Sequence, residues 1–325
     1  MRTPISRLFL CAALWLGASL AAQAQTTIPK LIKIVVPFSA GASNDVIARA
    51  IAVPLGQRLQ TTVIVENKAG AAGVIGSDAV AKSPRDGSVL LLTSSTFLTA
   101  AATQARLPYD PIAAFVPVAM VGEGPLLLAV AASTPYKTPA ELFAAARARP
   151  EELTYGTAGV GSVGHLATEL MSDAAKVRMR HVPYKGAANA TQDLAGGQID
   201  VMVANYSTLA AVIAKGGGGR VRPLAVTSKH PHPSFVGLPP LAASVSGYSM
   251  DIWIGVFAPA GTPAPLVERL NREINEISAS PELATLLGPD GTLPEAMTPA
   301  AFAARVKEDL AKWKQVAAEH KIIAE

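Results

Sequence analysis

The sequence repeats one unit, in which a short apolar run is followed by a loop of small residues and then by the start of a helix. The first copy begins with the apolar run 33–38 (KIVVPF), and the small residues Ser39–Ser43 follow it. Asn44 and Asp45 then stand where a helix N-cap is expected. Continuous apolar runs are typical of strands buried on both faces of a sheet. Their alternation with helices predicts an α/β fold with mainly parallel sheets.

Later units follow the same pattern through the rest of the chain. The pattern predicts further strands at 62–65, 88–93, 153–157, 180–183, 199–203 and 221–228. It predicts helices at 139–148, 187–195 and 206–215, a helix that ends near 82, and two C-terminal helices that begin at 262–263 and 298–299.

Two segments are expected to cross between lobes. Residues 116–131 hold two apolar runs split by Gly122–Pro125, and residues 248–258 are again strand-like. The order of elements therefore predicts two doubly wound lobes joined by two crossing segments. A cleft between two such lobes is the default place for a ligand. The predicted division assigns residues 25–124 and 253–325 to lobe 1 and residues 125–252 to lobe 2.

The N-terminus has the pattern of a secretory signal. Arg2 and Arg7 precede the apolar run 8–20, and Ala22-Gln23-Ala24 fits a signal peptidase site, so we expect cleavage after Ala24 and export. The run is too short to span a membrane, which takes about 20 residues. The one cysteine, Cys11, lies inside this segment. A mature chain without cysteine excludes disulfides, thiolate metal sites and cysteine nucleophiles.

The loop after the strand 153–157 suggests a nucleotide site at first. Gly159, Gly161 and Gly164 have the G-x-G-x-x-G spacing of a dinucleotide fingerprint. Such a site needs an acidic residue about 20 positions later to hold the ribose. Residues 181–185 (HVPYK) stand there and include no acid. We therefore predict that the chain binds no dinucleotide and no other cofactor.

The residues offer weak support for catalysis, metal binding or nucleic-acid binding. A hydrolase motif centred on Ser162 lacks its first glycine, because Val160 stands there, and Ser162 with His165 would still need a distant acid. The histidines lack metal-site spacing. The formal net charge is only +4, with 16% charged residues and no basic stripe, which argues against nucleic acid as a partner. We predict no catalytic residue, and an exported hydrolase is the alternative from another class.

Two loops remain as candidates for an anion site. Ser39–Asn44 and Gly159–Gly164 each follow a strand and open a helix, where unpaired N–H groups and the helix dipole favour a carboxylate or a phosphate. Two charge-assisted bonds from each loop, at roughly 1.5–3 kcal/mol apiece, would supply about 6–12 kcal/mol. A micromolar dissociation constant corresponds to about 8 kcal/mol. The loops therefore suit reversible capture of an anion.

Motifs along the whole mature chain resemble one family. The segments VVPFSAGASNDVIAR, IVENKAGAAGVIGSDAVAKSPRDG, LPYDP, YGTAGVGSVGHLATEL, HVPYKGAANATQDLAGGQID and VFAPAGTP, in this order, look like the Bug receptors, the extracytoplasmic solute receptors of tripartite tricarboxylate transporters. The resemblance implies a type II periplasmic-binding-protein fold, a periplasmic location, and delivery of a carboxylated solute to a large and a small membrane subunit. In the first loop Ala40, Gly41 and Ala42 replace the Pro-Gly-Gly run common in the family.

The resemblance also implies where the ligand binds. It places one ligand carboxylate between Ser39–Asn44 and Gly159–His165, with specificity set by the run 93–99 and by Asn205 and Tyr206. The predicted ligand-binding residues are Ser39, Ala40, Gly41, Ala42, Ser43, Asn44, Ser94, Ser95, Thr96, Phe97, Gly159, Gly161, Ser162, Val163, Gly164, His165, Asn205 and Tyr206.

The ligand class and two further acids stay open. Phe97 and Tyr206 would either sandwich an aromatic ring or pack internally, and Glu123 and Asp251 would contact either an amino group of the ligand or the hinge. We expect a monomer that binds a di- or tricarboxylate, an aromatic acid or an amino acid. A periplasmic receptor that presents its closed form to a membrane sensor is the alternative to a transport receptor.

Overall fold

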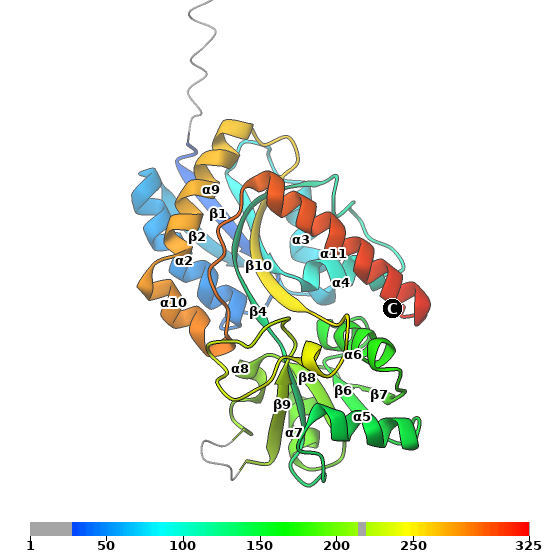
Figure 1. The fold of residues 1–325 in the computed structure, drawn as a ribbon. Helices are drawn as coiled ribbons and strands as arrows, with labels where there is room; N and C mark the ends of the chain where they lie inside the picture. The colour runs from blue at the N-terminus through cyan, green and yellow to red at the C-terminus, as the bar shows by residue number, and fades with distance from the viewer. Residues whose placement is uncertain (1–27, 214–218, 325) are drawn as a thin grey trace, which may run out of the picture.

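The computed structural model describes residues 28–213 and 219–324, which form two lobes placed one above the other in Figure 1. The predicted signal segment, with its cleavage after Ala24, lies outside the described residues, and so does Lys215. Each lobe is built on one five-stranded sheet flanked by helices. The two-lobe α/β fold predicted from the order of elements is confirmed.

The two sheets divide the strands between the lobes. We call the residues around the first sheet lobe 1 and those around the second sheet lobe 2. The first sheet has the order β2 (Thr62–Asn67), β1 (Leu31–Val36), β3 (Val89–Ser94), β10 (Asp251–Pro259) and β4 (Phe115–Pro125). The second sheet has the order β7 (Arg180–Pro183), β6 (Thr154–Thr157), β8 (Val201–Ala204), β5 (Leu127–Ala131) and β9 (Val221–Val226).

Both sheets are mixed, which corrects the prediction of mainly parallel sheets. β1 pairs in parallel with β2 and β3, and β6 pairs in parallel with β7 and β8. In contrast, β10 and β5 are antiparallel to both of their neighbours. The reason is that β5 and β10 arrive from the other lobe. They therefore enter their sheets at the cleft, where β1 and β6 end.

Helices cover the sheets and follow the strands as the sequence pattern requires. Among the described residues, no helix is long and apolar enough to cross a membrane. The helices are α2 (Ser43–Leu59), α3 (Val74–Ala81), α4 (Thr96–Thr103), α5 (Pro139–Ala148), α6 (Val163–Ala175), α7 (Ala187–Ala195), α8 (Tyr206–Leu209), α9 (Ala264–Ser278), α10 (Pro281–Leu287) and α11 (Pro299–Glu319).

The strands β4 and β10, which lead into the two crossings between the lobes, pair with each other in the first sheet. β4 continues through Gly122–Pro125, where the sequence predicted a break, and β5 begins two residues later. The glycines have a packing reason, because a Cβ on Gly124 would lie 2.6 Å from the carbonyl oxygen of Gly291. Glu123 and Leu293 exchange backbone hydrogen bonds at the same place. Small residues thus let the segment after α10 lie against the strand that joins the lobes.

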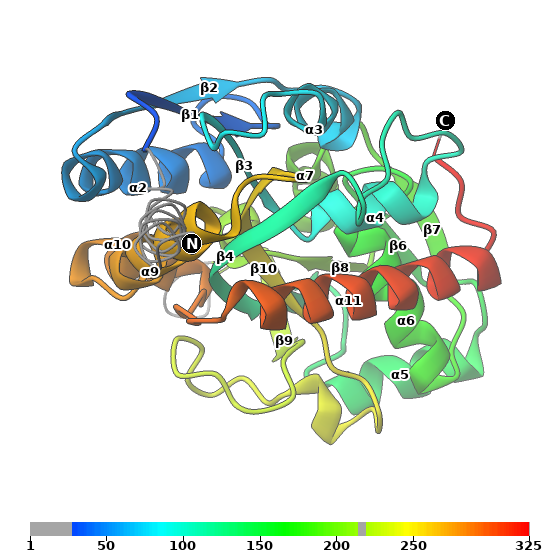
Figure 2. The same cartoon turned by 90° about the horizontal axis from the view of Figure 1, so that it is seen from above.

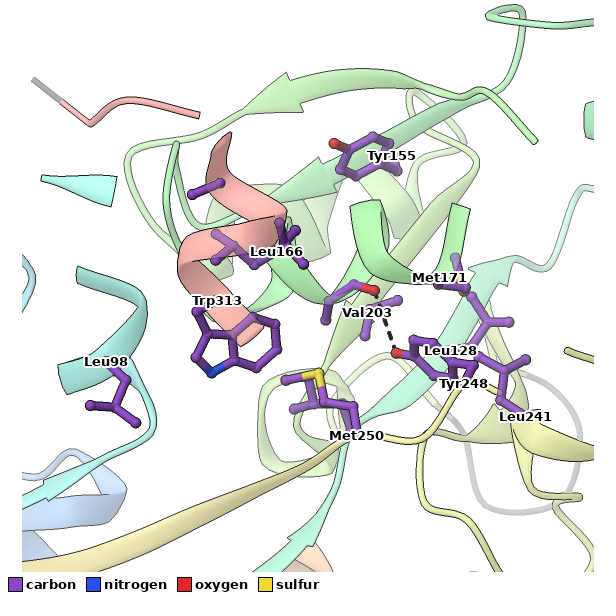
Figure 3. Packing of buried hydrophobic residues seen from close by; sticks show 14 of the residues in the cluster. Leu98, Leu128, Tyr155, Leu166, Met171, Val203, Leu241, Tyr248, Met250 and Trp313 are labelled. Carbon is purple, nitrogen blue, oxygen red and sulfur yellow. Dashed lines mark hydrogen bonds between the residues drawn. The ribbon is translucent and has the colours of Figure 1, made fainter. Parts of the chain in front are cut away.

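One apolar cluster extends through both lobes. It combines Leu98 and Trp313 of lobe 1 with Leu128, Leu166 and Met171 of lobe 2 (Figure 3). Helix α11 supplies part of this contact, because it packs on β4 and α4 and also reaches α6 (Figure 2). The helix is fixed to β10 by the indole N–H of Trp253, which donates to Asp309 Oδ2 at 2.9 Å.

Helix caps differ in two places from the sequence prediction. Ala42, and not Asn44 or Asp45, is the N-cap of α2, so both polar residues lie in the first turn. Helix α9 has Pro263 as its N-cap, one residue after the expected Thr262. Thr262 instead uses its hydroxyl to bond the carbonyl oxygen of Pro259 at 2.8 Å, which closes the turn before the helix.

Candidate functional site

Two adjoining cavities lie between the lobes. The first has a volume of about 300 Å³ and the second of about 310 Å³, and both are lined by residues of lobe 1 and lobe 2. Four residues line both cavities, which makes them one continuous cleft: Thr96, Val163, Asn205 and Thr208. The first cavity reaches the start of α2, and the second reaches the loop that precedes α6. Both predicted loops therefore open onto the same space.

The start of α2 presents free donors to the first cavity. Ser43 and Asn44 line this cavity, and their backbone N–H groups have no hydrogen-bond partner among the described residues. Such N–H groups in the first turn of a helix, at the positive end of its dipole, suit an anion. These N–H groups are two of the four donors expected from the two loops.

The Asp45 side chain holds the first loop through a hydrogen bond to Gly41. Its Oδ2 accepts the N–H of Gly41 at 2.8 Å and a bond from Arg49 Nε at 3.1 Å, and its Oδ1 accepts Asn67 Nδ2 at 2.9 Å. The hydrogen bond from Arg49, together with these other donors, lowers the pKa of Asp45 to about 2. The carboxylate is therefore ionised and paired with Arg49, and Asp45 does not line the cavity.

The start of α6 mirrors this arrangement in lobe 2. Ser162 is the N-cap, and its hydroxyl accepts the N–H of His165 at 3.4 Å. The N–H groups of Val163 and Gly164 have no partner among the described residues, and both residues line the second cavity. Gly161 has a φ of 76°, and a Cβ there would clash with Thr103 Oγ1 of the opposite lobe. Close approach of the two lobes therefore depends on this glycine.

His165 supports the second loop and does not line either cavity. It is 5% exposed, and its Nδ1 accepts the N–H of Gly161 at 3.2 Å. Its Nε2 lies 3.8 Å from Glu169 Oε1. Among the described residues, neither ring nitrogen is hydrogen-bonded to the Ser162 hydroxyl, so the arrangement is not that of a nucleophile and its base. Burial lowers the pKa of His165 to about 3, which keeps the ring neutral.

Hydroxyl groups line the first cavity beside α4. Ser94, Ser95 and Thr96 all face it, as the sequence predicted for this run. Ser95 also has a structural role, because its Oγ accepts the N–H of Trp253 at 2.9 Å and so joins β3 to β10. Ser94 Oγ bonds Thr96 Oγ1 at 3.2 Å. Thr96 then faces both cavities and stands at the centre of the cleft.

Of the two roles left open for Phe97 and Tyr206, the structure supports packing over an aromatic sandwich. Phe97 is 3% exposed and lines neither cavity, because its ring packs into an aromatic cluster with Tyr109, Phe115 and Phe257. Tyr206 is also absent from the cavity walls, and its ring lies 5.8 Å from that of Phe235. The Phe97 ring is therefore part of the interior of lobe 1, and the half-buried Tyr206 ring packs on Phe235. Asn205, which precedes Tyr206 in the chain, does line both cavities.

Several other predicted residues lie outside the cavity walls. Ser39, Ala40 and Gly41 are exposed at the tip of the first loop, whereas Ala42 lines the first cavity. Gly159 lines neither cavity, although Gly161 lines the second. The cavity walls therefore include Phe38 before the first loop and Ala158 and Val160 in the second, but not Ser39, Ala40, Gly41 or Gly159.

The two acids on the crossing strands also lie away from the cleft. Glu123 Oε2 is 3.1 Å from Arg305 Nη2 of α11, and burial raises the pKa of Glu123 to about 7. Burial also raises the pKa of Asp251. Neither residue lines a cavity, so their position supports the hinge interpretation.

A larger groove of about 720 Å³ lies between α5, α6 and the end of α11. His320 connects its walls, with Nδ1 at 3.0 Å from Glu169 Oε2 and Nε2 at 2.6 Å from Asp173 Oδ2. None of the predicted site residues lines this groove. Within the described part of the chain, no three His, Cys, Asp or Glu side chains meet in a way that would hold a metal ion. The candidate site is therefore the cleft with the free N–H groups.

The comparison with protein families decides the assignment. Residues 47–322 match the model of the tripartite tricarboxylate transporter family receptor. The chain belongs to this receptor family. The resemblance found in the sequence motifs is thereby confirmed.

Individual relatives of the receptor support the family assignment. It is 34% identical over 308 residues to the protein BugT of Bordetella pertussis, which covers 93% of each chain. The adipate-bound Rpa4515 of R. palustris is 34% identical, has a TM-score of 0.78, and matches 90% of this chain and 98% of that protein. The periplasmic binding protein BugD is 31% identical, with a TM-score of 0.75, over 92% of this chain and all of that protein.

The receptor also has cleft residues that sequence reasoning missed. Some of them adjoin the predicted loops and others come from distant segments: Phe38, Ala72, Ala100, Thr103, Gln104, Leu126, Thr157, Ala158, Val160, Ala187, Met202, Val203, Ala204, Ser207, Thr208, Ile252, Ile254, Asp290, Thr292 and Ala324. Thr208 follows Asn205 on the same turn, so its position was within reach of the sequence pattern. Asp290 and Thr292 follow α10 and reach the cleft only through tertiary packing, which no local pattern indicates.

Proposed function

We propose that the chain is a periplasmic receptor that binds a small carboxylate between its lobes and delivers it to the large and small membrane subunits of a tripartite transporter. The observation that carries the proposal is the convergence of two helix starts on one cleft. Ser43, Asn44, Val163 and Gly164 each offer an unpartnered N–H there. The adipate in the related Rpa4515 is a ligand of the same class.

Closure follows from this geometry. A carboxylate that takes donors from both α2 and α6 has more contacts when the lobes are closed, so it stabilises the closed state. No lysine or arginine is among the described residues that line the cleft, so binding rests on neutral donors. Capture by neutral groups, at roughly 1.5–3 kcal/mol per charge-assisted bond, permits release to the transporter.

Proline at position 163 tests the role of the N–H groups. Val163 is the first residue of α6, where proline is tolerated, and Ser162 before it is extended, with φ of −66° and ψ of 157°, as proline requires. Val163→Pro removes one donor, whereas Val163→Ala removes the same side chain and keeps the donor. We expect carboxylate affinity to fall at least tenfold in the proline variant only. Equal affinities in the two variants would contradict the proposal.

A thermal-shift screen tests the ligand class. Adipate, malate, citrate, benzoate and glutamate represent the expected acids, and glucose serves as the uncharged control. A ligand at 100 times its dissociation constant stabilises the native state by about 2.7 kcal/mol, which is readily measured. Stabilisation by glucose alone would overturn the carboxylate assignment.

Export, oligomeric state and the role in transport need their own measurements. N-terminal sequencing of the periplasmic protein should begin at Gln25 if the signal is cleaved after Ala24. Size-exclusion chromatography should give a monomer. Deletion of the chain should abolish uptake of the ligand; unchanged uptake with a lost transcriptional response would favour the sensing alternative. If the wild-type protein hydrolyses a substrate and Ser162→Ala does not, the result would instead support an exported hydrolase.

A further inference from the structure

The charge of the cleft is set by one side chain. Among the described residues that line the two cavities, Asp290 is the only one with an ionisable side chain. Every other lining residue is apolar or carries a hydroxyl, an amide, a thioether or only backbone groups. The described walls of the cleft therefore carry one negative charge and no compensating lysine, arginine or histidine.

Asp290 is held across the lobes. Its Oδ1 accepts the N–H of Ser207 at 2.6 Å, and its Oδ2 accepts the Ser207 hydroxyl at 2.9 Å. Ser207 also lines the first cavity, at the beginning of α8 in lobe 2. The Asp290 carboxylate thus already occupies these two donors. A ligand carboxylate that sought these two donors would meet a charge of its own sign.

The starts of α6 and α2, which also line the cleft, favour a negatively charged ligand group, the opposite of what Asp290 favours. The unpartnered N–H groups of Val163 and Gly164 favour a carboxylate there. A ligand with two carboxylates would then bring two negative charges into a space that already holds one. A ligand with one carboxylate and one ammonium group brings no net charge, and its ammonium can donate to the remaining lone pairs of Asp290.

We propose that Asp290 is a specificity-determining residue that selects a zwitterionic aminocarboxylate over a dicarboxylate of the same length. This inference rests on the carboxylate-binding function proposed above and adds the chemistry of the second ligand group. The amino group faces Asp290, while the carboxylate faces the starts of α6 and α2.

Matched ligand pairs test this selectivity by calorimetry. 5-Aminopentanoate is adipate with one carboxylate replaced by an ammonium group, and β-alanine has the same relation to succinate. Wild-type protein should bind the amino member of at least one pair ten times more tightly than its dicarboxylate. Asp290→Asn should lower this ratio at least tenfold. If Asp290 acted only through its contact with Ser207, the variant would bind both ligands of a pair more weakly by the same factor, and the affinity ratio would not change.

The control variant is Asp86→Asn. Asp86 also accepts the N–H and the hydroxyl of a serine, Ser88, at 2.9 Å and 2.6 Å, but it lies on the surface away from the cleft. In Asp86→Asn, the ratio of the affinity for the amino ligand to that for the dicarboxylate should equal the wild-type ratio. Preference of the wild-type protein for the dicarboxylates, or an unchanged ratio in Asp290→Asn, would overturn the role of Asp290 and leave the carboxylate receptor intact. Failure of every carboxylate to bind would overturn both proposals.

Discussion

The imidazole ring of His165 stacks on that of His181, with ring centroids 3.8 Å apart and planes inclined by 20°. His165 accepts the N–H of Gly161, and His181 Nε2 lies 2.7 Å from Thr157 Oγ1. The stacked pair therefore joins the end of β6 to the loop that opens onto the cleft. A charge on either ring would be buried beside the other, and the loop geometry depends on both rings staying neutral.

The first prediction concerns the protonation of this pair. Burial lowers the pKa of His165 to about 3 and that of His181 to about 4. Because the unfolded values lie near 6.5, the native state binds fewer protons between about pH 6.5 and 4, and stability falls as the pH drops through that window. ¹⁵N NMR should show both rings neutral at pH 5, with His165 protonated at Nε2. Titration of either ring near pH 6.5 would contradict this.

The second prediction concerns close approach of the lobes at Gly161. Gly161→Ala adds a Cβ that meets Thr103 and forces a positive φ on a residue that disfavours it. We expect at least tenfold weaker carboxylate binding and a radius of gyration that no longer decreases with ligand in small-angle scattering. Gly186→Ala is the control, because its Cβ meets nothing within 4 Å. Wild-type affinity in Gly161→Ala would show that closure does not bring these residues together.

The third prediction concerns the pH dependence of the stability that Asp45 contributes. Its pKa of about 2 lies below the unfolded value near 3.8, so its contribution to stability is present above about pH 4 and is lost as the pH falls toward 2. We expect Asp45→Asn to lower the free energy of unfolding by about 1–2 kcal/mol at pH 6 and by much less at pH 2.5. Urea unfolding at both pH values measures this. A difference independent of pH would assign the effect to packing.

The fourth prediction separates packing from ligand contact at Phe97. Because the ring lies in the aromatic cluster of lobe 1, Phe97→Ala should lower the free energy of unfolding by about 3–5 kcal/mol. Phe97→Leu should be milder and should leave ligand affinity within twofold of wild type. A tenfold loss of affinity in a stable Phe97→Leu protein would instead restore the ring to the binding site.

Local patterns predicted much of the fold. α5 (Pro139–Ala148), β7 (Arg180–Pro183) and α7 (Ala187–Ala195) have the bounds that the sequence indicated. A threonine cap followed by proline also located the start of α11 at Thr298-Pro299. These signals are contained within a few residues, so they need no tertiary information.

The sequence pattern failed where distant segments meet. Helix α4 was missed because the hydroxyl-rich run around Thr96 gains its buried face by packing on α11 and on other distant segments. The direction of β10 depends on the side from which the chain enters the sheet. Asp290 bonds Ser207 across a separation of 83 residues, so its place in the cleft cannot be inferred from neighbours in the chain. The loops that open α2 and α6 were found because their chemistry is local, although the N-cap of α2 is Ala42 and not Asn44 or Asp45.

The apolar cluster around Trp313 also bears on how the protein folds. Because Leu166 and Met171 of one lobe are covered by the same cluster as Leu98 of the other, neither lobe can form alone without leaving part of its interior in water. The boundary that the ligand meets at the cleft is therefore not a boundary between folding units. We expect the chain to unfold as one cooperative system, and a fragment cut at the crossing strands to be unstable by itself.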